Sequence, residues 1–284
     1  MQLYKLGLDG LTSLVHDKFR LERDIQNLIE TNISEIFSLK FVASELTVAN
    51  FRIDTLAFDE ESGAFVIIEY KRGNSYSVID QGYSYLSVML NNKADFILEY
   101  NERMNTTLRR DDVDWSLSRV IFVSQSFNEY QKNSVNFKDI PFELWEIRRF
   151  EGGIVSFDQH NATSKESIEI LTAATSDTAI SQVSSELRSY EEEDHLSGTS
   201  SQVVELWEKL KDELTGWGDV SCKPMRHYIG FKKGSSLFAA VRFMKNHMMI
   251  DFSRGYLSAE GKESKNFFTL DDPKMLADHR NWTH

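Results

Sequence analysis

Two apolar segments separated by a short turn constrain the fold of this chain more than any other feature. The first is Phe51–Asp59, the second is Ala64–Lys71, and Glu60–Gly63 between them is turn-like and ends in glycine. Segments of this kind joined by so short a connection predict a β-hairpin. Both faces of the two strands are apolar, which is typical of strands buried within a layered α/β sheet.

The register of this hairpin places three charged residues on one face. If Asp59 pairs with Ala64, Asp54 lies opposite Glu69, and directly opposed side chains have Cβ atoms about 5 Å apart. Lys71 follows Glu69 by two residues, so it returns to the same face. Two carboxylates beside a positioned amine can hold a divalent metal ion.

Composition defines the kind of chain that carries the hairpin. With 284 residues and 41% apolar content, it is long enough for one large or two medium domains. A single cysteine excludes an intrachain disulfide, and no apolar run approaches the roughly 18 residues of a membrane span. The first residues lack the basic-then-apolar pattern of a signal peptide. We therefore expect a soluble, cytoplasmic protein that is not inserted in a membrane.

Three parts are expected along the chain. Residues 1–160 form the first domain, residues 161–202 a Ser/Thr-rich linker, and residues 203–284 a C-terminal α+β module. The net charge is −12, and the acidic excess is concentrated in the linker, which includes the run Glu191–Asp194. Such a run is most simply a solvated surface. Some helix is expected in the linker at Ser164–Leu171 and Thr178–Tyr190.

The first strong helix is expected over Leu21–Phe37, where apolar residues recur with a 3.6-residue period. Glu22 projects close to the middle of this apolar stripe. A carboxylate aimed at a core is costly unless it meets a cation, which would bring Glu22 to the hairpin site. The alternative is an exposed position in the first turn, where the helix dipole favours an acid.

The order of the remaining elements predicts an α/β fold with a mixed sheet flanked by helices, followed by a smaller α+β domain. The further elements expected in the first domain are a strand at Lys40–Val48, a helix at Ser77–Leu90, a strand at Ser118–Ser124, a helix near Asn128–Asn136, and strands at Phe142–Arg149 and Gly153–Phe157. The C-terminal module is expected to have a helix at Val203–Leu214 followed by four strands.

The hairpin residues resemble the bipartite motif of the PD-(D/E)XK nuclease superfamily, an Asp followed by Glu-x-Lys. Asp54 supplies the first part, and Glu69 with Lys71 the second; Ile53 stands where the family often has proline. The Gln-x-x-x-Tyr spacing of Gln81 and Tyr85 is similar to the RecB-like branch and to archaeal endonucleases that act on branched or single-stranded DNA. Glu-x-Asp-Ile at Glu22–Ile25 is also similar to the first helix of that group. The match covers Leu21 to Phe157.

This resemblance implies a restriction-endonuclease-like sheet and metal-dependent hydrolysis of phosphodiester bonds. Asp54, Glu69 and the backbone carbonyl of Tyr70 would bind Mg²⁺ or Mn²⁺, which take oxygen ligands. Lys71 would orient the attacking water or assist its deprotonation, and Glu22 could complete the metal shell. The alternative is a buried ion pair of Lys71 with the two acids, without a metal, which is expensive to keep for stability alone.

Gln81 and Tyr85 lie four residues apart on one helical face, where they could contact Lys71 or the nucleic-acid backbone. In the alternative interpretation, Tyr85 is a core residue and Gln81 a surface residue.

Nucleic acid, most simply DNA, is the partner that the resemblance implies, with a homodimer as a further expectation. The groove residues would be Arg72, Lys93, Arg103, Arg109 and Arg110, but Asp111, Asp112 and Asp114 follow directly. The lack of a strongly basic stripe predicts weak or partner-assisted binding. The C-terminal module resembles a small α+β appendage of nuclease-like domains, through Lys223–Phe231 and Met248–Phe252, and would present nucleic acid or bind a protein partner.

Three interpretations of function stay open at this point. The first is a Mg²⁺-dependent endodeoxyribonuclease, in repair or defence. The second is a nuclease-fold protein that binds nucleic acid but is catalytically weak or needs a partner. The third is a regulatory protein in which the C-terminal module is the active part.

Overall fold

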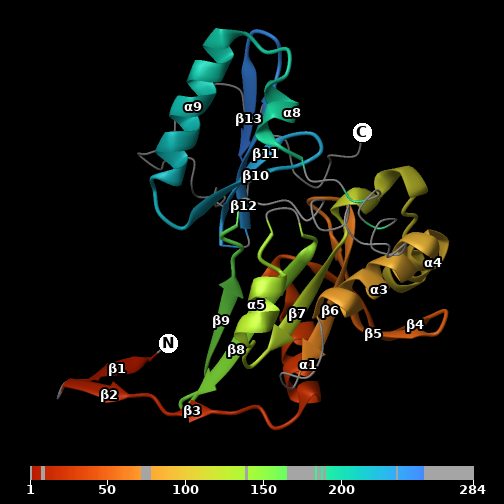
Figure 1. The fold of residues 1–284 in the computed structure, drawn as a ribbon, viewed down its shortest axis with the longest axis vertical. Helices are drawn as coiled ribbons and strands as arrows, with labels where there is room; N and C mark the ends of the chain where they lie inside the picture. The colour runs from red at the N-terminus through yellow and green to blue at the C-terminus, as the bar shows by residue number, and fades with distance from the viewer. Residues whose placement is uncertain are drawn as a thin grey trace. The chain divides into compact units, whose positions relative to one another are not determined.

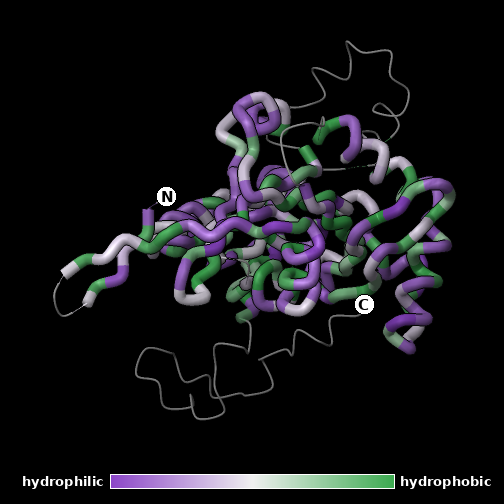
Figure 2. Tube along the Cα trace, turned by 90° about the horizontal axis from the view of Figure 1, so that it is seen from below, coloured by the Kyte–Doolittle hydropathy of each residue, from purple (hydrophilic) through white to green (hydrophobic). Residues whose placement is uncertain are grey.

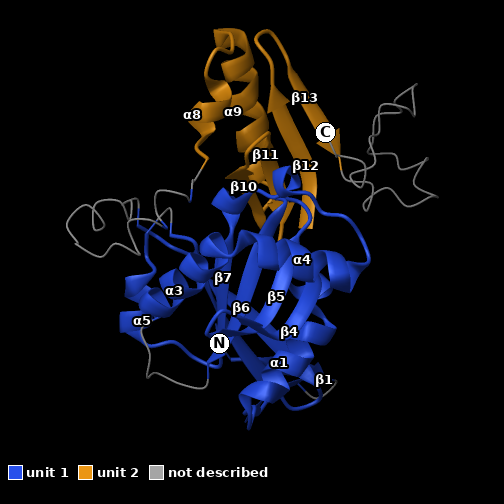
Figure 3. Cartoon of the chain, turned by 90° about the vertical axis from the view of Figure 1, so that its right-hand side faces the viewer, with its two compact units in different colours: residues 1–188 blue, residues 189–284 orange. Residues whose placement is uncertain are grey.

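The computed structural model describes residues 2–7, 10–71, 78–137, 140–164, 183, 187, 190–234 and 236–252. The chain divides into two compact units, Met1–Arg188 and Ser189–His284 (Figure 3). The second unit begins inside the segment expected as a linker. The linker helices expected at Ser164–Leu171 and Thr178–Tyr190 lie almost entirely outside the described residues.

The first unit alternates strands and helices (Figure 1). Its described elements are β1 (Tyr4–Gly7), β2 (Gly10–Ser13), β3 (His16–Asp17), α1 (Glu22–Thr31), α2 (Ile33–Phe37), β4 (Lys40–Val48), β5 (Phe51–Asp59), β6 (Ala64–Lys71), α3 (Val78–Asn91), α4 (Lys93–Met104), the 3₁₀ turns η1 (Arg110–Asp112) and η2 (Trp115–Leu117), β7 (Arg119–Ser124), α5 (Glu129–Ser134), β8 (Phe142–Phe150) and β9 (Ile154–His160).

A mixed sheet forms the centre of this unit, as the sequence predicts. Its described strands follow the order β3-β8-β7-β6-β5-β4, and β9 pairs with β8. The pairs β6–β7 and β7–β8 are parallel, whereas β5 is antiparallel to both β4 and β6. The parallel strands occupy the middle of the sheet, where both of their faces are buried.

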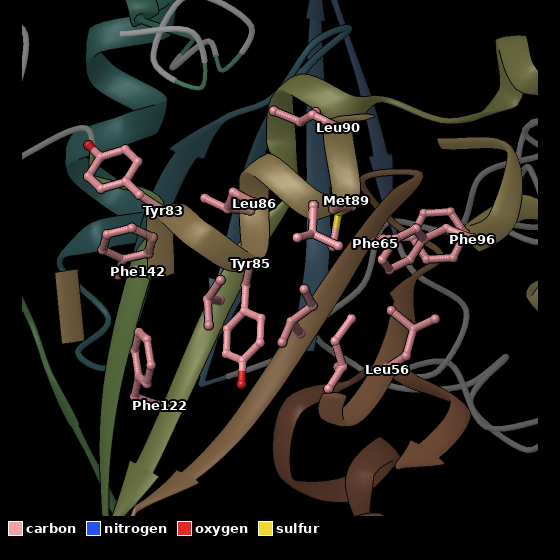
Figure 4. Packing of buried hydrophobic residues seen from close by; sticks show 14 of the residues in the cluster. Leu56, Phe65, Tyr83, Tyr85, Leu86, Met89, Leu90, Phe96, Phe122 and Phe142 are labelled. Atoms are coloured by element: carbon pink, nitrogen blue, oxygen red, sulfur yellow. The ribbon is translucent and has the colours of Figure 1, made fainter. Parts of the chain in front are cut away.

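Helices cover the two faces of the sheet, and alternate residues of β6 divide between them. Val66 and Ile68 pack in one apolar cluster with Ile25 and Ile29 of α1. Phe65 belongs to a second cluster, to which α3 and α4 contribute residues such as Leu86, Met89 and Phe96 (Figure 4). Since neighbouring residues of a strand point to opposite faces, α1 and the α3–α4 pair cover opposite sides of the sheet.

The predicted register of the central hairpin is confirmed. Asp59 pairs with Ala64, and the ladder continues to the pair Thr55 and Ile68. Asp59 also accepts hydrogen bonds from the turn amides, with its Oδ1 3.1 Å from the amide nitrogen of Glu61. Gly63 ends the turn at φ 64°, a backbone conformation that glycine adopts without strain.

The prediction of one helix over Leu21–Phe37 is wrong, because the helix is interrupted at Asn32. The Asn32 side chain donates to the carbonyl of Leu28, and the hydroxyl of Thr31 donates to the carbonyl of Asn27 at 2.7 Å. Side chains of these types compete with the helical backbone for hydrogen bonds. The result is two shorter helices, α1 and α2, in place of one.

Strands β1 and β2 form a hairpin near the start of the chain that was not predicted. It projects from the rest of its unit and contains hydrophobic residues (Figures 1 and 2). All its residues are exposed, Leu6 at 78% and its partner Leu11 at 68%. Helix α4 was also missed; only two of its residues, Phe96 and Tyr100, are buried, so the sequence of this helix has a weak apolar period.

The second unit is a four-stranded antiparallel sheet packed against a helix. Its described elements are α8 (Glu192–Leu196), α9 (Ser201–Thr215), β10 (Val220–Pro224), β11 (Ile229–Lys233), β12 (Ser236–Phe243) and β13 (Met248–Phe252). Trp207 of α9 is fully buried and contacts Phe231 and Phe243 of the sheet.

In the acidic run Glu191–Asp194, the residues Glu191, Glu193 and Asp194 are exposed, as the sequence-based interpretation expects, whereas Glu192 is partly buried. It begins α8, and the carboxylate of Glu192 accepts hydrogen bonds from the Trp207 indole and from Lys211, 2.6 Å away. A carboxylate that binds both an indole N–H and an ammonium contributes to packing in this unit. Among the described helices, none has the length and apolarity needed to cross a membrane.

Candidate active site

Asp54 and Glu69 lie next to each other where the β5–β6 ladder ends. Asp54 precedes Thr55 on β5 and Glu69 follows Ile68 on β6, so both are adjacent to the last ladder pair. The backbone N–H of Tyr70 donates to Asp54 Oδ2 at 3.1 Å, which fixes the Asp54 carboxylate against β6. At this position the Asp54 side chain accepts the hydrogen bond from β6 that a backbone carbonyl of β5 would accept in a regular ladder. The site is built around this carboxylate.

Three donors surround the Glu69 carboxylate, which is only 6% exposed. Lys71 Nζ and Gln81 Nε2 donate to Oε1 at 3.0 Å and 2.9 Å. The hydroxyl of Tyr85 lies 2.8 Å from Oε2. Gln81 and Tyr85 are also in contact, with 3.1 Å between Nε2 and the hydroxyl oxygen.

Helix α3 brings Gln81 and Tyr85 to the sheet. Tyr85 extends from α3 among the packed side chains of the cluster in Figure 4. Between the two residues lies Gly82, where an added Cβ would be only 2.5 Å from Cε1 of Phe142. Glycine at this position allows the helix to approach β8 closely enough for the two side chains to reach Glu69.

The electrostatics of the pair of acids favour a bound proton or cation. Burial, followed by the nearby negative charge of Glu69, raises the pKa of Asp54 to about 7, although the hydrogen bond from the Tyr70 amide opposes this shift. Burial, followed by the charge of Glu69, also raises the pKa of Tyr85 above its usual value. Tyr85 is therefore a neutral donor to Glu69 at physiological pH.

The residues present fit a hard divalent cation. Within the described ranges no group of three or more His, Cys, Asp or Glu side chains is arranged to hold a metal ion. A site with two carboxylates and a backbone carbonyl, that of Tyr70, is nevertheless the donor set that Mg²⁺ accepts, because Mg²⁺ keeps several of its waters. The half-buried Asp54 has a raised pKa partly because its negative charge is repelled by that of Glu69. A bound cation would offset this repulsion.

Of the six side chains expected at the site, the structure brings five together, namely Asp54, Glu69, Lys71, Gln81 and Tyr85. Tyr85 is both a core residue and a site residue, since it is buried and its hydroxyl contacts Glu69. The alternative interpretation expects an ion pair of Lys71 with both acids, and the structure contains the Lys71–Glu69 part of it.

Glu22 is exposed in the first turn of α1, the position that the alternative interpretation gives it. The α1 residue that contacts Asp54 is Gln26, one turn later, whose Nε2 lies 3.1 Å from the Asp54 carbonyl oxygen. Sequence reasoning missed this residue. The signal was a glutamine between Ile25 and Ile29, on the buried side of the helix.

Two of the basic residues expected to line a groove contact other side chains. Lys93 lies over the Trp115 ring at 5.7 Å, and Arg103 pairs with Glu99. Arg109 and Arg110 are exposed. Arg72 lies outside the described residues.

Comparison with known proteins defines the family. Over 278 residues the chain is 41% identical to a protein of Haemophilus influenzae whose description reads "Uncharacterized protein", covering 98% of this chain and 88% of that protein. The chain belongs to the same family as this protein. Residues 192–283 match the model of a domain of unknown function, DUF5655.

Two solved structures show weak likeness. One is a repair endonuclease from Pyrococcus abyssi, with 19% identity, a TM-score of 0.28, and coverage of 43% of this chain and 45% of that chain. The other is a chain of the complex of EndoMS with dsDNA, with 20% identity, a TM-score of 0.26, and coverage of 46% and 47%. The chain spans less than half the length of each.

Proposed function

We propose that this protein is a metal-dependent nuclease that hydrolyses phosphodiester bonds in DNA. The observation that carries the proposal is the arrangement around Glu69: a neighbouring acid with a raised pKa, an ammonium group at 3.0 Å, and a Gln–Tyr pair on the same carboxylate. Buried charges are costly, and such a cluster is expected where chemistry is done.

The proposed metal ligands are Asp54, Glu69 and the carbonyl of Tyr70. A bound Mg²⁺ or Mn²⁺ would polarise the scissile phosphate and lower the pKa of a water molecule bound to it. Hydrolysis would form a bond between a water oxygen and phosphorus while the bond to the leaving oxygen breaks; the water would release one proton, and the leaving oxygen would take one up. Lys71 would orient the water by donating a hydrogen bond to it, and its charge would stabilise the negative charge that develops on the phosphate.

Gln81 and Tyr85 would hold the Glu69 carboxylate in one orientation. Both donate to Glu69 from a helix that is packed on the sheet, so they restrict its rotation. A preorganised carboxylate needs little rearrangement when the cation binds.

The decisive experiment is cleavage of single-stranded, duplex and flapped DNA, with matched RNA strands, in Mn²⁺ or Mg²⁺ at low salt. Wild type is compared with Glu69→Gln and Lys71→Met, which keep the size of each side chain. Two matched controls remove similar charges elsewhere in the sheet. Glu143→Gln changes an acid on β8 that binds Arg119, and Lys40→Met changes a lysine on β4 that pairs with Glu60.

We expect the two site variants to lose cleavage by at least about a hundredfold while the controls retain it. Cleavage that survives in Glu69→Gln and Lys71→Met would contradict the proposal. If wild type cuts no substrate but binds Mn²⁺ through Asp54 and Glu69, a binding protein that requires a partner becomes the better interpretation. If RNA alone is cut, the nuclease stands and the substrate class changes.

A further inference from the structure

A second polar cluster lies on the opposite face of the hairpin from Lys71 and Gln81. Its members are Gln26 and Glu30 of α1, Thr55 of β5 and the hydroxyl of Tyr70 of β6. Gln26 is only 8% exposed, and its Nε2 lies 3.0 Å from Glu30 Oε1, 3.1 Å from the Asp54 carbonyl oxygen and 3.2 Å from Ser44 Oγ. The helix α1 therefore contacts directly the backbone of a proposed metal ligand.

Hydrogen bonds continue from Glu30 to β6. The Thr55 hydroxyl donates to Glu30 Oε1 at 2.6 Å and lies 3.1 Å from the Tyr70 hydroxyl. Because Thr55 has one hydrogen and gives it to Glu30, the Tyr70 hydroxyl must be the donor to Thr55. The direction of the chain is thus fixed, from Tyr70 through Thr55 to Glu30.

These polar groups are embedded among apolar side chains. Thr55 is fully buried and Tyr70 is 3% exposed, and the surrounding cluster includes Ile25, Ile29 and Ile68. An apolar contact between α1 and the sheet would be cheaper than a buried polar group, which must be hydrogen-bonded to be tolerated. Packing of the helix alone therefore does not account for the choice of these residues.

The contacts fall on the residues that hold the site. Gln26 contacts the carbonyl of Asp54, and Thr55 is the next residue along β5. Tyr70 is held through its hydroxyl, while its N–H holds the Asp54 carboxylate and its carbonyl is the third proposed ligand. The cluster thus restrains Asp54 and Tyr70 from the face opposite the reaction.

We propose that Gln26, Glu30 and Thr55 are positioning residues, which set the places of the Asp54 and Tyr70 ligands from the α1 side of the hairpin. This inference rests on the proposed function, since it assigns the cluster a role in holding the same metal ion. Partners of this kind, one step removed from the metal, typically change its affinity by about 10- to 100-fold.

The test measures Mn²⁺ affinity by electron paramagnetic resonance, and thermal unfolding, for wild type, Thr55→Val, Thr55→Ser and Gln26→Leu. Thr55→Val keeps the shape but removes the hydroxyl, whereas Thr55→Ser keeps the hydroxyl. Ile29→Val is the matched control, because it removes one buried methylene from the same helix without touching the polar cluster. Hydrogen exchange of the Tyr70 amide, measured without metal, gives a second readout.

We expect Thr55→Val and Gln26→Leu to weaken Mn²⁺ binding by about tenfold or more and to speed exchange of the Tyr70 amide. Thr55→Ser should restore most of the affinity, and Ile29→Val should bind Mn²⁺ within about twofold of wild type. If Gln26→Leu does not fold, the difference in Mn²⁺ affinity between Thr55→Val and Thr55→Ser still tests the positioning role.

The outcomes separate the two proposals. If wild type binds Mn²⁺ and Thr55→Val binds it equally well, the positioning role is overturned and the proposed nuclease stands. The same conclusion follows if Ile29→Val weakens Mn²⁺ binding as much as Thr55→Val does. A wild-type protein that binds no Mn²⁺ would overturn both.

Discussion

Glu69 is the residue at which the contacts of the site converge, and its hydrogen bonds have consequences for stability. Both oxygens of its carboxylate are already used, Oε1 by Lys71 and Gln81 and Oε2 by Tyr85. A carboxylate that is 6% exposed depends on these donors, because water cannot fully replace them. Removing each donor can therefore be tested for its effect on the stability of the metal-free protein and on the rate of the proposed cleavage.

Removing the Tyr85 hydroxyl should destabilise the protein. In Tyr85→Phe, Glu69 Oε2 loses its donor at 2.8 Å, and hydrogen bonds to charged groups contribute about 1.5–3 kcal/mol. We expect the free energy of unfolding in urea to fall by about that amount, and metal-dependent cleavage to slow. Tyr83→Phe, a buried tyrosine on the same helix, is the control; an equal loss of cleavage there would argue against a specific role for Tyr85.

Asp54 should make the stability of the metal-free protein depend on pH. Its folded-state pKa is about 7, above the ordinary value of 3.8, so the folded protein binds more protons than the unfolded chain between these values. The contribution of Asp54 is therefore fully present below the ordinary pKa of 3.8 and is lost as the pH rises from there through about 7.

The measurement is urea unfolding in a chelator across that range, with Asp54→Asn as the comparison. The difference in unfolding free energy between Asp54→Asn and wild type should increase as the pH rises. Asp158→Asn, at an exposed acid on β9, is measured in parallel as the control. A flat difference for Asp54→Asn would show that the carboxyl titrates normally in the folded protein.

At the scale of elements, the close approach of α3 to the sheet is what assembles the site. Gly82→Ala would place a Cβ 2.5 Å from the Phe142 ring, so the ring or the helix must move. Overpacking of this kind costs about 1–3 kcal/mol. We expect Gly82→Ala to lose that much stability and, because Gln81 is adjacent, to lose cleavage beyond what the drop in stability explains. Ser87→Ala on the same helix is the control; activity in Gly82→Ala equal to that of this control would contradict the account.

The central hairpin could be predicted because its information is local. Two apolar strands, a short turn ending in Gly63 and a period of two were enough to place Asp54, Glu69 and Lys71 together. The position of α3 followed from its apolar content, whereas Gln81 and Tyr85 were singled out by the resemblance to the Gln-x-x-x-Tyr spacing of the nuclease family.

The missed features depend on contacts between distant segments. The role of Gln26 requires that α1 pack on the face of β5 behind Asp54, and no local pattern encodes that placement. The break at Asn32 results from side-chain hydrogen bonds that compete with the helix, and the acidic Glu192 finds Trp207 and Lys211 only after α8 folds back on α9.

At the scale of the whole molecule, two lysines share one face of the sheet in the second unit. Lys223 and Lys232 lie on neighbouring strands β10 and β11, on the face opposite Cys222 and Phe231, which point toward α9. Lys233 is exposed at the end of β11. In the proposed nuclease, this face would contribute to nucleic-acid binding by charge.

The double variant Lys223→Ala/Lys232→Ala should bind DNA more weakly at low salt, and the slope of log affinity against log salt should decrease by about one to two. Cleavage at saturating DNA should be unchanged. Fluorescence anisotropy at several salt concentrations is the measurement, with Lys209→Ala on α9 as the control. An unchanged salt slope would assign this face to another role.

The β1–β2 hairpin has a practical consequence for handling the protein. Two-stranded hairpins are marginally stable alone, and this one exposes Leu6 and Leu11 on one face of the ribbon. Exposed backbone that opens easily is where proteases cut first. A chymotrypsin-like enzyme should therefore trim this hairpin early, whereas the β5–β6 strands, with buried residues on both faces, should survive in the resistant fragment.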